Sequence, residues 1–545
     1  MTRREPLEAL AVAACGAVLL ALLAWTWAHR LNYPFDLEWM EGGMLAHAWR
    51  LRHGLPLYDP PSVDFVPFIY PPGQPALVAA LSRVFGLSMP LGRMVSILST
   101  LAAAAALAFA LRPRGPAQGR WTDALAAATV FLGTYPHAGA FYDLVRPDAL
   151  SVALLGWAVA LASERSRRAA VAAGLLLAGA TLAKHNAAIF GLPLTLGLAL
   201  RDRRAAVAFG VAWLGGTAAW FVPIEVATEG RLSTWLFEVP AAHRMLWWHG
   251  PIESVREWGT ALPIAFAVLG GWAVVRAVGA PRGPLWLVAG APVWAGMLLA
   301  WAFTYHPPGD GSPLVPVAYA VAYWALAAGP LAALLGRQPW TRDAVAVALV
   351  VGTAAFAAAL MRIHDGGFVN VHTPLFWTLS WALGHALVAL RRQGHRQLVP
   401  AAWCIQLLWA SVELRPAALI PTAADVAAGW RFVDRIRGVD GPVLSPFAPW
   451  LPVYAGKPPS LHAMGVWDCN YDGGPFQDDL TALQRGLREQ YWTLILGGNR
   501  PLLGDFSVYY EPDAPVLDEA DPAFWPRTGY PARPGPVWVP REERP

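Results

Sequence analysis

Asp36-Leu37-Glu38-Trp39-Met40-Glu41 places three carboxylates within six residues, directly after the first apolar segment of the chain, residues 8–28. A carboxylate placed where a helix leaves a bilayer costs free energy unless it faces water, so carboxylates at such a position face water or take part in a reaction. We therefore expect a functional loop at this position, with a proton-accepting carboxylate in it.

The composition of the chain is that of a protein that lies mostly in lipid. Hydrophobic residues make up 56% of its 545 residues and charged residues only 14%, against about 25% charged residues in soluble domains. The three cysteines, Cys15, Cys404 and Cys469, are far apart, which excludes a disulfide framework and a CxxC metal site. The sequence predicts a polytopic α-helical membrane protein and no nucleic-acid partner.

Apolar segments of helical length follow one another along the first 412 residues. Thirteen are found, at about 8–28, 91–111, 121–141, 148–163, 168–183, 186–200, 205–224, 260–278, 285–303, 314–335, 342–361, 368–390 and 398–412. Several are shorter than the roughly 20 residues that span a bilayer, so short, tilted or merged spans stay as alternatives. Lys184-His185-Asn186 is compatible with a bent hairpin. We expect about 13 transmembrane helices in a module over residues 1–415.

Arginine placement tests this topology independently, because basic residues are retained on the cytoplasmic side. Clusters of arginines lie before the first apolar segment, at 3–4, and in every second connection between the apolar segments, at 112–120, 165–168, 201–204, 276–282, 337–342 and 391–396. This predicts a cytoplasmic N-terminus and an outer first loop over residues 29–90. The first segment lacks a small-residue cleavage site before the acidic stretch, so we expect it to be retained as an anchor.

From about Pro416 the composition changes, since Asp, Glu, Pro and Gly rise and no further segment of membrane length follows. Hydrophobic periodicity predicts helices around 432–436 and 480–491 and strands at 442–445 and 492–496. We therefore expect a small α/β extracytoplasmic domain over residues 416–545, with a Pro-rich tail from roughly Asp513.

The first outer loop carries its motifs in a definite order. The carboxylates are followed by Trp49-Arg50-Leu51-Arg52-His53-Gly54-Leu55-Pro56-Leu57-Tyr58, a short amphipathic helix with a G-x-P-x-Y turn. Phe68-Ile69-Tyr70-Pro71-Pro72-Gly73 then gives a Y-P-P-G turn before a second interfacial helix. This order resembles the outer loop of lipid-dependent glycosyltransferases of the GT-C fold. It is most similar to the bacterial family 39-type branch, relatives of protein O-mannosyltransferases and of the aminoarabinose transferase that modifies lipid A.

The resemblance implies an enzyme that moves a sugar from a polyprenyl-phosphate carrier to an extracytoplasmic lipid, polysaccharide or protein, with inversion at the anomeric carbon. It implies that an acidic residue of the first outer loop is the base, which maps onto Asp36 or Glu38. Both remain candidates, because this sequence has Asp-Leu-Glu where the family commonly has Asp-Glu. A carboxylate within hydrogen-bond reach takes the proton of an attacking hydroxyl. The alternative is that both are solvated loop residues or helix N-caps.

A departing lipid phosphate needs cations fixed close by. Arg146 and Asp148 lie where the fourth apolar segment starts, Lys184 at another outer turn, and His306 at a third. We expect these four residues to bind the phosphate and sugar of the donor, since arginine holds two phosphate oxygens and lysine supplies a point charge. The alternatives are an ion pair of Arg146 with Asp148 or Asp143 that caps a span, and an ordinary polar turn around His306.

Two further alternatives stay open at this stage. Asp36-x-Glu38 is compatible with the D-x-D signature of metal-dependent sugar transferases, because two carboxylates can share a divalent cation. Family 39-type relatives generally work without a metal, so we predict no cofactor and no metal ligand, and a divalent cation stays a possibility. A transporter of a lipid-linked or polar substrate and a non-catalytic membrane scaffold are the other functional classes. A transporter would place its ionisable residues mid-span and show paired half-repeats, which are not seen here.

Overall fold

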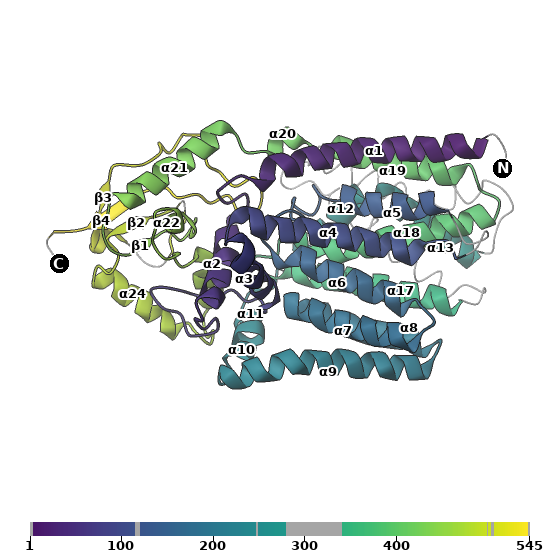
Figure 1. The fold of residues 1–545 in the computed structure, drawn as a ribbon, viewed down its shortest axis with the longest axis horizontal. Coiled ribbons are helices and arrows are strands. Elements are labelled where there is room, and N and C mark those ends of the chain that lie inside the picture. The colour runs from purple at the N-terminus through teal and green to yellow at the C-terminus, as the bar shows by residue number, and fades with distance from the viewer. Residues whose placement is uncertain are drawn as a thin grey trace, which may run out of the picture.

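The computed structural model describes residues 4–114, 120–246, 249–278, 341–498, 500–502 and 506–542. A bundle of long helices fills one end of the molecule, and a small sheet with short helices fills the other (Figure 1). The start of the first helix and the sheet lie at opposite ends of the long axis. This arrangement separates an apolar module from a polar one.

The bundle consists of apolar helices that run along the long axis (Figure 1). They are α1 (Arg4–Leu31), α4 (Met89–Leu111), α5 (Trp121–Gly133), α6 (Pro147–Ala162), α7 (Arg167–Ala183), α8 (Gly191–Ala199), α9 (Arg203–Ala227), α13 (Pro263–Val278), α17 (Arg342–Ile363), α18 (Thr373–Arg392) and α19 (Leu398–Glu413). Buried alanines predominate between α4, α5, α6 and α7, which lets these helices approach closely.

Length and composition identify five helical segments in the described part of the chain that can cross a membrane. They are Pro6–Leu31, Met89–Leu111, Arg203–Ala227, Arg342–Ile363 and Val369–Arg392. Shorter apolar helices lie at Trp121–Gly133, Pro147–Ala162, His185–Ala199 and Leu398–Glu413. The chain is a multi-pass helical membrane protein. The predicted number of thirteen spans is not confirmed, and the segments at 285–303 and 314–335 lie outside the described residues.

Short helical elements connect these helices. They are η1 (His185–Phe190), α10 (Arg231–Ser233), η2 (Thr234–Glu238), α11 (Val239–Ala241), α12 (His249–Ala261), η3 (Val369–His372) and α20 (Pro416–Leu419). The predicted bend at Lys184 is confirmed, because α7 ends at Ala183 and Lys184 takes an extended backbone before η1. The chain then turns back through η1 into α8.

The first loop folds into the two predicted short helices, α2 (Glu41–Arg52) and α3 (Gly73–Phe85). The first eight residues of α2 are all buried. Met44 and Leu45 of α2 belong to one hydrophobic cluster with Phe68 of the loop and with Trp450 and Leu461 of the C-terminal region. The loop is therefore packed between the bundle and the C-terminal domain.

The C-terminal domain contains α21 (Ala423–Arg437), β1 (Val443–Leu444), α22 (Leu451–Tyr454), α23 (Ala463–Cys469), η4 (Asp478–Leu480), α24 (Thr481–Arg488), β2 (Leu494–Leu496), η5 (Phe506–Val508), β3 (Tyr510–Asp513) and β4 (Val537–Pro540). The sheet order is β1-β2-β4-β3, with β1 parallel to β2 and the other pairs antiparallel. The predicted helices and strands of this domain are confirmed. The Pro-rich tail was expected to follow the domain, but it supplies β4 to the middle of the sheet.

Candidate functional site

Glu41, the third carboxylate of the acidic stretch, is a structural residue. Its Oε2 lies 2.7 Å from Nη2 of Arg93 on α4, and its Oε1 lies 3.0 Å from Nε of the same guanidinium. The backbone N–H groups of Leu37 and Val145 donate to it at 2.7 and 2.9 Å. Burial raises the pKa of Glu41, but Arg93 and these hydrogen bonds outweigh burial, and the pKa is lowered overall. Glu41 therefore stays charged and holds the loop against α4 and the start of α6.

Glu38 lies next to a second arginine. Its side chain is almost fully buried, with 1% of its surface exposed. Oε2 accepts a hydrogen bond from the Met40 N–H at 3.2 Å and lies 3.5 Å from Nη1 of Arg146. Burial raises the pKa of Glu38 to about 7, and the positive charge of Arg146 limits that rise. A carboxylate of this kind can gain or lose its proton at neutral pH.

Asp36 points in a different direction from Glu38. Its Oδ1 accepts the backbone N–H of Gly42 in the first turn of α2 at 2.5 Å. A Cβ on Gly42 would lie 3.0 Å from that oxygen and from Trp450, so Asp36 faces the C-terminal domain. Within the described residues it forms no ion pair. Burial, together with the negative charge of Glu41, raises the pKa of Asp36 well above its usual value.

Arg146 is held at the start of α6 by an aromatic residue of the first loop. Its Nη2 donates to the hydroxyl of Tyr70 at 2.9 Å, and its guanidinium carbon lies 5.4 Å from the centres of the Tyr70 and Phe141 rings. Nε of Arg146 is buried and has no hydrogen-bond acceptor in the described part of the chain. A buried N–H without an acceptor costs about 1–3 kcal/mol. This donor is thus available to a ligand.

Asp148, two residues further along, organises a second polar cluster. Nζ of Lys184 donates to its Oδ1 at 2.7 Å, and Nδ2 of Asn370, in η3, donates to the same oxygen at 2.9 Å. Oδ2 of Asp148 is buried and has no donor among the described residues. Three separate segments, α6, the end of α7 and η3, therefore meet at this carboxylate.

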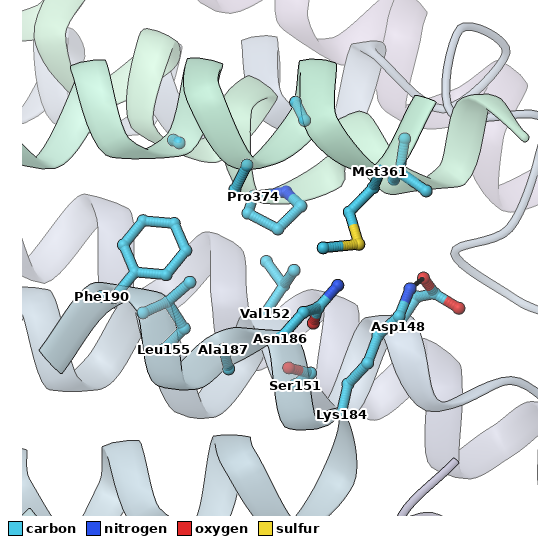
Figure 2. Close-up of a pocket in the computed structure, with 14 residues that line it drawn as sticks. Asp148, Ser151, Val152, Leu155, Lys184, Asn186, Ala187, Phe190, Met361 and Pro374 are labelled. Carbon is cyan, nitrogen blue, oxygen red and sulfur yellow. Dashed lines mark hydrogen bonds and ion pairs between the residues drawn. The ribbon is translucent and has the colours of Figure 1, made fainter. Parts of the chain in front are cut away.

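A small cavity opens beside Asp148 and Lys184 (Figure 2). Its polar end holds Asp148, Ser151, Lys184 and Asn186. The rest of its wall is apolar and consists of Val152, Leu155, Ala187, Phe190, Ala354, Ala357, Ala358, Met361, Val371 and Pro374. Figure 2 shows Lys184 and Asp148 together at one end, with Phe190 and Leu155 toward the other. The shape and lining suit a molecule with an anionic head and an apolar body.

The structure brings together most of the residues that the sequence singled out. Glu38 contacts Arg146, and Lys184 contacts Asp148, with Arg146 and Asp148 joined through Pro147. Asp36 lies apart from these contacts, and His306 lies outside the described residues.

A divalent metal ion does not fit the carboxylates of this site. In the described ranges no three His, Cys, Asp or Glu side chains gather in a group that could hold one. Asp36 and Glu38 accept hydrogen bonds from different backbone groups, and only Glu38 faces a guanidinium. Residues Asp36-x-Glu38 therefore do not form a shared ligand pair.

Two residues of the site were not singled out by their own chemistry. Asn370 gives no signal in the sequence, and Tyr70 was noted only as part of a turn. Gln74, in the first turn of α3, is fully buried, and neither atom of its amide has a partner within the described residues. A polar residue after the Y-P-P-G turn is a weak signal, because nothing in the sequence shows that the position is buried.

The comparisons with known proteins find similarity in structure only. No protein-family model matches the chain, and no curated protein sequence matches it significantly. ArnT from Cupriavidus metallidurans bound to undecaprenyl phosphate aligns with a TM-score of 0.43 and 17% identity, over 82% of this chain and 85% of that one. Its apo state gives a TM-score of 0.42. AglB, an archaeal oligosaccharyltransferase from Archaeoglobus fulgidus in complex with an inhibitory peptide and a dolichol-phosphate, aligns with a TM-score of 0.45 and 10% identity, over 91% of this chain and 70% of that one. The chain is thus similar in fold to ArnT, solved with undecaprenyl phosphate, and to the oligosaccharyltransferase AglB, solved with a dolichol-phosphate.

Proposed function

We propose that this protein is a membrane glycosyltransferase that moves a sugar from a polyprenyl-phosphate carrier to an acceptor outside the cytoplasm, with inversion. One observation carries the proposal. Arg146 and Asp148, at the start of α6, have a buried carboxylate, Glu38, on one side and a lysine at the mouth of an apolar cavity on the other. In this proposal the C-terminal domain faces outward from the inner membrane of a bacterium.

The polar atoms without partners match the donor that we propose. A phosphate oxygen would accept the free N–H at Nε of Arg146, and a sugar hydroxyl would donate to Oδ2 of Asp148. Lys184 supplies a second positive charge, and it is one of only two lysines among the 41 basic residues of the chain. The apolar cavity beside it would take the first part of the lipid chain.

The reaction is a single displacement. The hydroxyl oxygen of the acceptor forms a bond to the anomeric carbon, and the bond from that carbon to the phosphate oxygen breaks. The electron pair leaves with the phosphate, and the hydroxyl proton passes to the carboxylate of Glu38. Attack on the face opposite the phosphate inverts the anomeric centre.

The charges of the site are suited to this step. A phosphodiester carries one negative charge, and the phosphate monoester that leaves carries two. Before the reaction, the charges of Glu38, Asp148, Arg146, Lys184 and the donor give the site a net charge of −1. Because Glu38 takes up a proton as the phosphate departs, the net charge after the reaction is also −1. Because the net charge of a buried site does not change, the step needs little reorganisation of its surroundings.

Glu38 is the better candidate for the base than Asp36. Glu38 faces Arg146, which we place at the donor phosphate, whereas Asp36 accepts the Gly42 N–H on the other side of the loop. The pKa of about 7 at Glu38 also suits a group that is deprotonated before the reaction and takes up a proton during it.

Transfer by the purified full-length protein in lipid nanodiscs tests the proposal. Undecaprenyl-phosphate-linked hexoses and pentoses with a radioactive sugar would be incubated with bacterial envelope fractions, which contain lipid, polysaccharide and protein acceptors. We expect Glu38→Gln to abolish transfer and Asp36→Asn to retain a measurable part of it. Full transfer by both variants would refute a base in this loop.

A cryo-EM structure with undecaprenyl phosphate gives a second test, since phosphate density away from Arg146 and Lys184 would refute the donor site.

A further inference from the structure

A segment of the C-terminal tail, residues 527–530, crosses the acidic stretch, and we call it the strap. The Arg527 N–H donates to the Leu37 carbonyl at 2.8 Å, and Thr528 pairs with Glu38 in a parallel β-bridge. The hydroxyl of Thr528 donates to the carbonyl of Gly139 at 2.6 Å, in the connection between α5 and α6. The strap therefore joins the first loop to the region just before Arg146.

Gly529 of the strap lies directly against the carboxylate of Glu38. A Cβ on Gly529 would lie 2.8 Å from both Cγ and Oε1 of Glu38, a separation that real side chains do not adopt. Gly529 also has a φ of +79°, a conformation that favours glycine. One oxygen of Glu38 thus faces Arg146 and the Met40 N–H, and the other faces the strap.

The strap is fastened at one end to the C-terminal domain and at the other end to both that domain and the first loop. The guanidinium of Arg527 pairs with Asp425, which also forms the capping box at the start of α21 with Thr422. At the other end, the ring of Tyr530 lies 5.2 Å from the ring of Trp39 and 5.7 Å from that of Trp467. These anchors hold Gly529 in place over Glu38.

We propose that the strap is part of the reaction site, where it positions the Glu38 carboxylate toward Arg146 and keeps water away from it. The inference rests on the proposed function, in which Glu38 is the base. It assigns to the C-terminal domain a positioning role in the reaction itself, through Gly529 and Thr528.

The strap acts by excluding water and not by its own charge. The charges that act on Glu38 include those of Arg146, Glu41, Asp148 and Asp36, all from the bundle and the first loop. The one charged side chain of the strap, Arg527, pairs with Asp425 instead. Because burial is the main cause that raises the pKa of Glu38 to about 7, admission of water beneath the strap would lower that pKa toward the ordinary value.

Infrared titration of the Glu38 carboxyl group tests this without a transfer assay. The full-length protein in nanodiscs would be titrated, with the difference from Glu38→Gln assigning the carboxyl band. We expect a midpoint near pH 7 in the wild type, and a midpoint lower by about one pH unit or more in Gly529→Ala. Gly473→Ala is the matched control, because Gly473 also has a positive φ, +75°, but a Cβ there would meet nothing within 4 Å. An unchanged or higher midpoint in folded Gly529→Ala would overturn the inference.

Two further variants keep the test decisive. If Gly529→Ala does not fold, Thr528→Val, which loses only the bond to the Gly139 carbonyl, takes its place, and the same drop in midpoint is expected. In the double variant Gly529→Ala/Glu38→Ala, both Glu38 atoms that the new methyl group would meet are removed, so melting should return toward that of Glu38→Ala alone. No recovery of melting would argue against the contact.

Full transfer by Glu38→Gln would refute the role of Glu38 as the base and not its contact with Gly529. The two proposals can therefore fail separately.

Discussion

Nη2 of Arg93 lies 2.7 Å from Oε2 of Glu41, and neither side chain is exposed to solvent. The same guanidinium donates to the carbonyls of Arg30, Tyr33 and Phe35 at 2.5 to 3.0 Å. One arginine of α4 thereby fixes the end of α1, the residues after it and the start of α2. The geometry of the acidic stretch depends on this contact.

Arg93→Met should destabilise the protein strongly. The change leaves the Glu41 carboxylate buried without its cation, and loss of one partner of a buried ion pair costs about 3–5 kcal/mol. Thermal melting in detergent, followed by tryptophan fluorescence, measures the effect. Arg83→Met, at an exposed position on α3, is the matched control and should melt like the wild type. Equal melting of the two variants would show that the loop does not depend on Arg93.

The rate of transfer should depend on the protonation of Glu38. A base must be deprotonated to act, so the rate should rise about tenfold per pH unit below the pKa of Glu38 and level off above it. With the pKa raised to about 7 by burial, the bend in the profile of kcat/KM is expected near pH 7. Asp36→Asn should keep that bend. A bend near pH 4 in the wild type would mean that the base is a solvated carboxylate.

Lys184→Ala should weaken binding of undecaprenyl phosphate. A hydrogen bond to a charged group contributes about 1.5–3 kcal/mol, so the dissociation constant should rise about 10- to 100-fold, as measured by native mass spectrometry of the protein in nanodiscs. Lys457→Ala changes the other lysine of the chain, which is half-buried and donates to the Gly441 carbonyl. It should bind like the wild type. Equal affinity of both variants would remove Lys184 from the donor site.

Ala358→Phe should block the apolar part of the cavity. Ala358 is on α17 and lines the cavity, and the larger ring would take up space that we assign to the lipid chain. We expect loss of undecaprenyl phosphate binding in the same assay, together with a lower melting temperature, because Ala358 is 1% exposed and overpacking of a buried position costs about 1–3 kcal/mol. Ala348→Phe introduces the same ring on the exposed side of α17 and should bind normally. Unchanged binding by Ala358→Phe would place the chain elsewhere.

Gln74→Leu should raise the stability of the protein. The amide of Gln74 is buried and lacks partners among the described residues, and its replacement by an apolar side chain of similar size removes a cost of about 1–3 kcal/mol. A higher melting temperature is therefore expected. A lower melting temperature would show that the amide is satisfied in the protein.

Local patterns allowed the sequence to predict the helical class, the two short helices of the first loop and the strands β1 and β2. These features depend on hydropathy and periodicity within about 20 residues. The contacts that build the site could not be predicted in this way. Glu38 and Arg146 are 108 residues apart, and Asp148 and Asn370 are 222 residues apart, so only the packing of α6 against the first loop and η3 brings them together.

Polarity and proline content also misled the interpretation of the tail. Val537–Pro540 is short and ends in proline, yet it pairs with β2 on one side and β3 on the other. Gly529 is one of 50 glycines in the chain, and nothing local distinguishes it. Gly529 matters to the proposed site because it contacts Glu38, which lies almost 500 positions earlier in the sequence.

The position of β4 between β2 and β3 sets the order in which the protein can be completed during synthesis. Residues up to 513 can leave the ribosome and still lack the strand that joins β3 to the rest of the sheet. The segment that covers Glu38 immediately precedes that strand. A chain that stops between β3 and the strap would have its apolar helices but an uncovered Glu38 carboxylate, so the site that we propose is complete only after residues 527–530 have been made.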